Sequence, residues 1–201
     1  MKKILIAVVL SLFLSSNAFA QYTVKNTRDC DELSFDDSQC DLNGNPITGI
    51  KRFYNNNGVL DLEITYKDGR KEGITRNYYE NGTLMNEKTY KNGKLEGLLK
   101  DYYRNGNLQL EAHYKNGMEE GIAKFYYETG NLRNEGNYKN GKPEGLAKIY
   151  YETGHLRAEA NCKNGKAVSG YNYDKSGKKT KMTNDQLNNF DENLYLIPPP
   201  F

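Results

Sequence analysis

Side chains that commonly carry chemistry are few in this 201-residue chain, and their spacing predicts no catalytic or metal site. The two histidines, His113 and His155, have no partner at the spacing of a metal-ligand set. The stretch DLNGNPITG from Asp41 resembles the start of a calcium loop. However, Pro46 stands where the glycine belongs and Arg52 where the bidentate glutamate belongs. No phosphate-binding loop, dinucleotide fingerprint or nucleophile elbow occurs. We therefore expect a protein that is not an enzyme and that has neither a metal nor a cofactor.

The first 20 residues have the composition of a secretory signal peptide. Two lysines precede an apolar run from Ile4 to Leu14, and the segment ends with Ala-Phe-Ala at Ala20. We expect cleavage after Ala20 and a mature chain that begins at Gln21 and is periplasmic or secreted. The alternative is a buried N-terminal strand or helix. No later apolar run is long enough to predict a transmembrane segment.

The charge balance argues against a nucleic-acid partner. The whole chain has 28 basic and 26 acidic residues, and both charges of the first 20 residues are the lysines Lys2 and Lys3. The mature chain therefore carries 26 of each sign and lacks the basic footprint of a nucleic-acid-binding protein.

The three cysteines fall into two groups. Cys30 and Cys40 lie in the segment 21–48, which we interpret as a cap on the N-terminal edge of a sheet. In an exported chain a disulfide between them is expected, and two free thiols in a reducing niche are the alternative. Cys162 occupies a position where the other repeats have tyrosine, so we predict a buried, unpaired thiol.

The dominant pattern of the sequence is a 24-residue repeat. YKNGKLEG at residues 90–97 returns as YKNGMEEG at 114–121 and YKNGKPEG at 138–145, with YKDGRKEG before them. Asn-Gly or an equivalent dipeptide interrupts the chain about every 12 residues, which favours β-hairpins with type I′ turns. We predict an all-β protein, an elongated single-layer antiparallel meander of roughly ten strands. Five repeats span residues 49–168, and a partial repeat follows at 169–182.

Cross-strand chemistry predicts the register of each hairpin. With Asn81-Gly82 at the centre of a two-residue turn, Arg76 falls opposite Glu87, and Gly73 falls opposite Tyr90. The same pairings recur in every unit except that Cys162 replaces the last tyrosine. Opposite charges across strands contribute about 0.2–1 kcal/mol each, and an aromatic ring over a cross-strand glycine stabilises its strand. A three-residue loop would shift the partners by one residue, so we expect the shorter turn.

Alternation along the strands predicts two unlike faces. One face is charged along its middle and carries the equivalents of Ile74, Arg76, Tyr78 and Glu87. The other face is drier and carries the equivalents of Tyr79, Leu84 and Tyr90, joined in later units by Ala123, Phe125, Ala147 and Ile149.

A row of tyrosines on the drier face is the predicted partner-binding site. It consists of the second tyrosine of each Tyr-Tyr pair, namely Tyr79, Tyr103, Tyr127 and Tyr151. Tyrosine is enriched in binding sites because it offers a large, fairly rigid contact area with a polar tip. The alternative is that these rings only pack on one another and beneath the C-terminal helix.

The repeat pattern YYxNGxLxxExxYKNGKxxG resembles the MORN repeat, in particular its bacterial, antitoxin-like variant. The resemblance covers residues 49–168 and implies an elongated, twisted sheet of successive hairpins that acts as a scaffold binding proteins or membranes. The chain departs from the commoner MORN form because it lacks tryptophan and doubles the tyrosine. The lipid preferences proposed for other MORN proteins are therefore not carried over.

Residues 183–201 differ from the repeats. Thr183 and Gln186 form a capping-box pattern, and Leu187, Phe190 and Leu194 follow at helical spacing. We predict a short amphipathic helix over about 184–195 with its apolar side on the sheet, followed by a Pro-rich tail. A membrane-surface helix is the weaker alternative because the polar side is acidic.

Three functions fit this architecture. The first is an exported, non-enzymatic scaffold that binds a protein partner at the cell surface, in the periplasm or on a host. The second is an immunity or antitoxin-like protein that neutralises one toxin. The third is a glycan-binding module in which tyrosine rings stack on sugars, although comparable choline-binding repeats use tryptophan and this chain has none.

Overall fold

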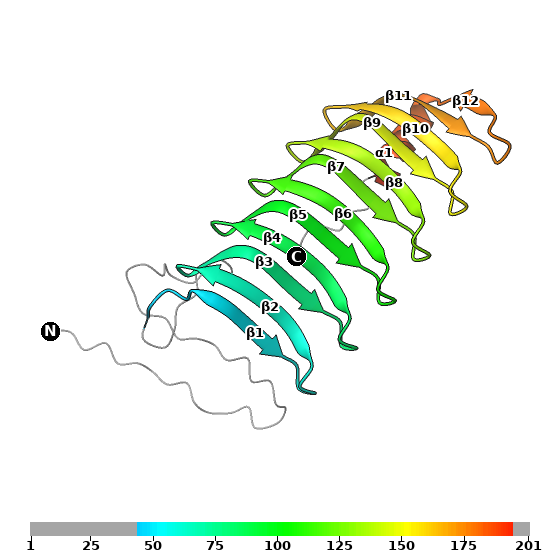
Figure 1. Cartoon of the computed structure of the whole chain (residues 1–201). Helices are drawn as coiled ribbons and strands as arrows, with labels where there is room; N and C mark the ends of the chain where they lie inside the picture. The colour runs from blue at the N-terminus through cyan, green and yellow to red at the C-terminus, as the bar shows by residue number, and fades with distance from the viewer. Residues whose placement is uncertain (1–43, 195–201) are drawn as a thin grey trace, which may run out of the picture.

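The computed structural model describes residues 44–194 and shows one open antiparallel sheet followed by a single helix (Figure 1). Its twelve strands are hydrogen-bonded in chain order: β1 (Gly49–Tyr54), β2 (Leu60–Lys67), β3 (Arg70–Tyr78), β4 (Leu84–Lys91), β5 (Lys94–Tyr102), β6 (Leu108–Lys115), β7 (Met118–Tyr126), β8 (Leu132–Lys139), β9 (Lys142–Tyr150), β10 (Leu156–Lys163), β11 (Lys166–Tyr173) and β12 (Lys179–Lys181). The helix α1 (Asn184–Leu194) ends the described chain. The predicted single-layer meander with a short C-terminal helix is confirmed, and the partial repeat brings the total to twelve strands.

The turns between successive units are the tight hairpins that Asn-Gly predicts. Asn92 and Gly93 both have positive φ, 51° and 79°, and the flanking residues Lys91 and Lys94 pair directly. This is the geometry of a two-residue type I′ turn. An asparagine or aspartate with φ of 51–52° recurs at this position in every unit, at Asp68, Asn92, Asn116, Asn140 and Asn164.

A repeated glutamate supports four of these turns, and at the first turn the backbone N–H of Asp68 donates instead to the Thr48 hydroxyl at 3.0 Å. The Glu72 carboxylate accepts a hydrogen bond from the backbone N–H of Asn92 at 2.7 Å, and the contact recurs at intervals of 24 residues. The equivalent pairs are Glu96 with Asn116, Glu120 with Asn140 and Glu144 with Asn164. In the second to fifth units, the glutamate before the unit glycine therefore ties neighbouring units together along one side of the array.

The turns inside each unit differ from the prediction. The backbone N–H of Gly82 donates to Tyr79 O, and the N–H of Tyr79 donates to Thr83 O, each at 2.8 Å. Gly82 has a φ of 81°, whereas Asn81 is absent from the positive-φ residues of the described chain. The loop is thus a three-residue one, a turn closed by a left-handed glycine, and the predicted two-residue turn at Asn81-Gly82 is wrong.

The predicted register nevertheless holds. Arg76 pairs with Glu87 and Gly73 with Tyr90, because one extra residue on β4 between Leu84 and Asn86 compensates for the longer loop. The same shift recurs near the end of every first strand of a unit. A bulge and a three-residue loop together keep the pairing that a two-residue loop alone would give.

The bulge also moves one residue to the other face. Leu84 is paired directly with Tyr78, and directly opposed residues point to the same side of a sheet. Leu84 therefore lies on the charged face, and its predicted place on the drier face is wrong. The placements of Tyr90, Ala123, Phe125, Ala147 and Ile149 hold, since these residues belong to or pack against the buried clusters.

The drier face of the sheet, which we call the dry face, carries two clusters of buried apolar side chains. The first apolar cluster spans β5–β8 and consists of Leu95, Leu99, Leu110, Ala112, Tyr114, Ala123, Phe125 and Tyr138. The second apolar cluster joins β9–β11 to the helix and consists of Ala147, Ala158, Ala160, Cys162, Met182, Leu187, Phe190 and Leu194. The sheet thus has one face that is largely buried and one that is open.

The C-terminal helix forms as its sequence predicts. The Thr183 N–H donates to the Gln186 side chain at 3.0 Å, and the Gln186 N–H donates to the Thr183 hydroxyl at 3.3 Å, which is a capping box. The apolar residues Leu187, Phe190 and Leu194 are buried against the sheet. Within residues 44–194 no helix has the length and hydropathy of a membrane span.

Cys162 is a buried free thiol, as predicted. Burial raises its pKa to about 11, so the thiol is protonated at neutral pH. The predicted signal peptide and the Cys30–Cys40 disulfide lie outside the described residues, as do the Pro-rich tail and most of the N-terminal cap.

Candidate functional site: the ladder face

The open side of the sheet presents rows of like side chains along the array, and we call it the ladder face. Its middle row alternates basic and acidic residues from successive strands: Arg52, Glu63, Arg76, Glu87, Lys100, Glu111, Lys124, Glu135, Lys148 and Glu159. An aliphatic row lies beside it, made of Ile50, Ile74, Leu98, Ile122 and Leu146. A tyrosine row lies on the other side, made of Tyr54, Tyr78, Tyr102, Tyr126 and Tyr150.

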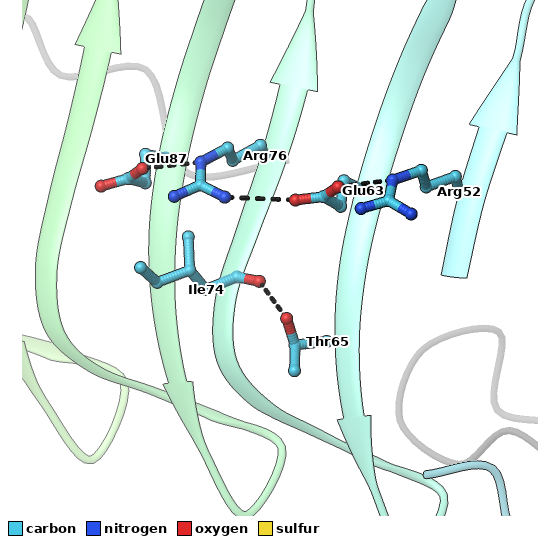
Figure 2. A network of polar contacts seen from close by, with 6 residues as sticks. All are labelled: Arg52, Glu63, Thr65, Ile74, Arg76 and Glu87. Carbon is cyan, nitrogen blue, oxygen red and sulfur yellow. Dashed lines mark hydrogen bonds and ion pairs between the residues drawn. The ribbon is translucent and has the colours of Figure 1, made fainter. Parts of the chain in front are cut away.

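The charged row forms a continuous network where its bases are arginines. Arg52 Nε contacts Glu63 Oε2 at 2.7 Å, and Arg76 bridges two carboxylates, with Nη1 3.1 Å from Glu63 Oε1 and Nε 2.9 Å from Glu87 Oε2. Figure 2 shows the four side chains in one line across β1–β4, above a hydrogen bond from the Thr65 hydroxyl to Ile74 O. The planar guanidinium can hold two carboxylates at once, which explains the unbroken line.

The network loosens where lysine replaces arginine. Lys100 Nζ lies 3.7 Å from Glu111, and Lys148 Nζ lies 3.9 Å from Glu135. Lys124 has no ion pair within 4.0 Å among the described residues. The ammonium is a point charge on a flexible stem and loses the fork geometry of arginine. All predicted cross-strand registers are present, but only the arginine units turn them into short contacts.

Tyrosines of the neighbouring row donate to the later glutamates of the ladder. The Tyr150 hydroxyl donates to Glu135 Oε1 at 2.8 Å, and the Tyr173 hydroxyl donates to Glu159 Oε1 at 2.6 Å. Burial, followed by the bond to Glu135, raises the pKa of Tyr150 to about 12. The bond from Tyr173 and the ammonium of Lys179 lower the pKa of Glu159. Both carboxylates therefore already have hydrogen-bond donors within the sheet.

Three of the five side chains of the aliphatic row are about half exposed, whereas Ile74 and Leu98 are partly buried. Ile50, Ile122 and Leu146 expose 54%, 51% and 42% of their surface. These side chains follow the unit glycine and stand on alternate strands, about 9–10 Å apart. Single exposed apolar residues need no explanation, but a regular line of them beside charged residues is typical of a surface that other molecules cover.

The predicted tyrosine site lies at the other edge of each unit. Tyr79, Tyr103, Tyr127 and Tyr151 begin the within-unit turns, and each hydroxyl donates to the backbone oxygen of the tyrosine that ends the first strand of the next unit. The acceptors are Tyr102, Tyr126, Tyr150 and Tyr173, at 2.6, 2.7, 2.8 and 3.2 Å. The rings are half-buried, and their polar tips already have partners. Their role in partner binding stays a prediction.

Among residues 44–194, the other features that could carry chemistry include a hollow beside α1 and two histidines. A hollow of about 380 Å³ lies beside α1 and is lined by Tyr151, Arg157, Asn172, Tyr173 and Phe190 among others. His113 is an exposed residue of β6, and the His155 ring lies 3.2 Å from the Thr153 hydroxyl in a turn. Over residues 44–194, no group of three His, Cys, Asp or Glu side chains could hold a metal ion.

Sequence reasoning missed the exposure of the aliphatic row. It placed Ile74 on the charged face but gave the binding role to the second tyrosines, because aromatic residues are the commoner anchors of interfaces. The available signal was an isoleucine or leucine directly after every unit glycine, on the face where the alternation also places the charges. An aliphatic residue repeated on the polar face of a sheet points to a surface that is covered by something else.

Fold and site together define an open, single-layer array of β-hairpin repeats with one buried and one accessible face. A family model described as MORN repeat variant matches five segments, residues 47–68, 71–92, 95–116, 119–140 and 143–164, which together cover more than half of the chain. The chain therefore belongs to the MORN repeat variant family. Arrays of this family are repeat scaffolds for protein or membrane binding. No curated protein matches the chain.

Proposed function

We propose that the chain is an exported, non-catalytic scaffold that binds a protein partner through the ladder face. The supporting observation is the aliphatic row, which leaves Ile50, Ile122 and Leu146 about half exposed beside a ladder of charges. Apolar contacts flanked by polar groups are the usual composition of a protein interface. The opposite face is largely buried by the two apolar clusters, so it offers less surface to a partner.

The charges of the ladder favour a protein over an anionic membrane. The row contains five basic and five acidic side chains in strict alternation, so it has no net charge. Attraction to anionic lipid requires a basic excess, which this row lacks. An alternating row suits a partner that presents both signs, because complementary charges fix the register of two protein surfaces.

Residues 1–20 support export, since a basic start, an apolar run and a small-residue end are typical of a cleaved leader. The test is the intact mass of the protein recovered from its native host. A mass that begins at Gln21 supports export, and a chain that retains residues 1–20 would contradict it.

A photo-crosslinking amino acid at Ile122 tests the proposed surface in the native cell. The matched position is Thr129, an exposed residue in the turn of the same unit. We expect one protein to be captured from position 122 and not from position 129. Equal capture from both positions would contradict the proposed face. If the captured protein is a toxin, the antitoxin-like role follows, and capture of cell-wall glycan in place of protein would contradict the proposal.

A further inference from the structure

A second charged feature of the sheet lies at the turns between successive units. The two residues that flank each of these turns pair directly across strands, and in four of the five turns both are basic and exposed. The four pairs are Lys67 with Arg70, Lys91 with Lys94, Lys139 with Lys142, and Lys163 with Lys166. We call these eight side chains the basic edge. The turns that carry them lie along one edge of the array (Figure 1).

The basic edge projects to the same side of the sheet as the aliphatic row. Tyr90 belongs to the dry face, and successive side chains of a strand alternate, so Lys91 projects to the ladder face. Lys94 is directly opposite Lys91 and therefore projects to the same side. Thr89, which pairs with Ile74 of the aliphatic row, is two residues from Lys91, about 6.5–7 Å along β4. The aliphatic row thus lies between the basic edge and the middle row of alternating charges.

Folding alone does not account for the basic pairs. Like charges directly opposite each other destabilise a sheet, yet this pairing recurs in four units. Among residues 44–194, no side chain of the basic edge has an ion pair within 4.0 Å. The remaining turn shows that the hairpin does not need two bases, because Lys115 is there opposite Met118. A repeated and unfavourable pairing of exposed charges indicates a surface that attracts an anionic partner.

The acidic residues near the basic edge already have hydrogen-bond donors, with one exception. The five segments 67–72, 91–96, 115–120, 139–144 and 163–168 contain ten basic and six acidic residues. Four of the six are the glutamates that support the turns, and Glu119 accepts a hydrogen bond from the Tyr114 hydroxyl at 2.9 Å. The five within-unit turns at the opposite edge contain one basic residue and three acidic ones. The two edges therefore differ in sign, which would orient a charged partner across the sheet.

The basic pairs and the aliphatic side chains recur with the period of the array, about 9–10 Å. An extended segment in the polyproline conformation returns its side chains to the same side every third residue, which is about 9.3 Å. Such a segment can place one carboxylate at each basic pair and one apolar side chain at each member of the aliphatic row. A flat anionic membrane fits less well, because it would also meet the five carboxylates of the middle row.

We propose that the basic edge and the aliphatic row together bind an extended acidic segment of a protein partner. The carboxylates of the segment lie against the basic pairs, and its apolar side chains cover the aliphatic row. Contacts between ammonium and carboxylate groups fix the register of the segment along the array. The inference rests on the proposed function, because it names the chemistry of the partner that the same face binds.

A fluorescein-labelled peptide of five Glu-Leu-Pro repeats is a defined probe of this chemistry. It repeats a carboxylate and a leucine at about the spacing of the units. Fluorescence polarisation should show that the protein binds this peptide and that added NaCl weakens the binding. Peptides of five Lys-Leu-Pro or five Glu-Ser-Pro repeats should each bind at least about tenfold more weakly. No binding of the Glu-Leu-Pro peptide, or equal binding of either control peptide, would overturn the proposal.

Two double variants separate binding from folding. Lys91→Glu with Lys139→Glu places a carboxylate opposite the remaining lysine of two basic pairs, so the melting temperature should stay unchanged or rise. Binding of the Glu-Leu-Pro peptide should nevertheless weaken at least about tenfold. The matched control is Lys175→Glu with Lys178→Glu, the same change of charge in the exposed turn after β11, and it should bind like wild type. Wild-type binding by the first variant, or an equal loss in both, would overturn the proposal.

Failure of this inference is distinguishable from failure of the proposed function. If crosslinking from Ile122 captures a protein but the Glu-Leu-Pro peptide does not bind, the ladder face has a partner of other chemistry and only the inference is overturned. If the protein binds vesicles with about 30% phosphatidylserine and not the peptide, the basic edge is a membrane surface, which also overturns the inference. Peptide binding that is lost in Lys91→Glu with Lys139→Glu and kept in the control variant supports it.

Discussion

Arg76→Ala should destabilise the array more than the same change at any lysine of the ladder. Arg76 holds Glu63 at 3.1 Å and Glu87 at 2.9 Å, and the Glu63 side chain is only 11% exposed. A cross-strand or surface pair contributes about 0.2–1 kcal/mol, so two pairs contribute about 0.4–2 kcal/mol, and the short distances place the cost of Arg76→Ala in the upper half of that range. Glu63 keeps its contact with Arg52 at 2.7 Å, which limits the cost of leaving a carboxylate without a partner.

Lys124→Ala is the matched control, because Lys124 holds the same place two units later without an ion pair within 4.0 Å in the described sheet. It should cost less than about 0.5 kcal/mol. Arg76→Lys should recover about half of the loss, since an ammonium holds one carboxylate well but not two.

The assay is urea unfolding followed by circular dichroism at low salt and at about 1 M NaCl, where charges are screened beyond about 3 Å. The gap between Arg76→Ala and Lys124→Ala should narrow at high salt. Hydrogen exchange should place the loss of protection in β2–β4, because each unit of a repeat array contacts mainly its neighbours. Equal destabilisation by the two alanine variants, or a gap that salt does not change, would refute the role assigned to the arginine network.

Three further changes test other parts of the structure. Burial raises the pKa of Asp101, so protonation of this carboxyl favours the folded state. The stability that Asp101 contributes is present below the unfolded pKa of 3.8 and is lost as the pH rises through the folded pKa. Asp101→Asn should therefore raise the melting temperature at pH 7, with the difference disappearing below about pH 3.8; a gain that is equal at both pH values would contradict the cause. Gly106 has a φ of 87°, and no atom lies within 4 Å of an added Cβ. Gly106→Val should therefore cost about 1–2 kcal/mol of unfolding free energy from backbone strain alone. Thermal unfolding measures this loss, and an unchanged melting temperature would contradict the turn assignment. Tyr103→Phe removes the hydroxyl that donates to Tyr126 O at 2.7 Å and should cost about 0.5–1.5 kcal/mol while partner binding is unchanged. Lost binding without lost stability would instead assign the second tyrosines to the interface.

The fold could be predicted well from the sequence because the same turn dipeptides and cross-strand pairs recur in five units. The pairing of Arg76 with Glu87 and of Gly73 with Tyr90 follows from charge and shape, and it is present in the structure. The loop at Gly82 could not be predicted in the same way, because a two-residue turn and a three-residue loop with a bulge give the same register for these pairs. The bulge changes only the residues nearest the turn, and Leu84 is on the opposite face for that reason.

The candidate site was harder to predict because the exposure of a side chain depends on which face of the sheet other elements cover. The sequence locates Ile122 and Tyr127 on opposite sides of the sheet but does not say which side a second layer covers. The structure shows that α1 lies on the dry face and that the Tyr127 hydroxyl donates to Tyr150 O, whereas the Ile122 side chain is half exposed. The capping box made the helix predictable, but the face of the sheet on which the helix packs depends on contacts between residues far apart in the sequence.

Partner binding through the ladder face is tested most directly by measuring how tightly two double variants bind the partner protein that is captured by crosslinking from position 122. Ile122→Asp with Leu146→Asp places two charges on the aliphatic row, and Thr129→Asp with Thr153→Asp places the same two charges in exposed turns of the same units. By isothermal titration calorimetry, the first pair should weaken binding at least about tenfold, which corresponds to about 1.4 kcal/mol, at an unchanged melting temperature. The second pair should bind like wild type. Wild-type affinity in the aliphatic-row variant, or an equal loss in both variants, would contradict binding through the ladder face.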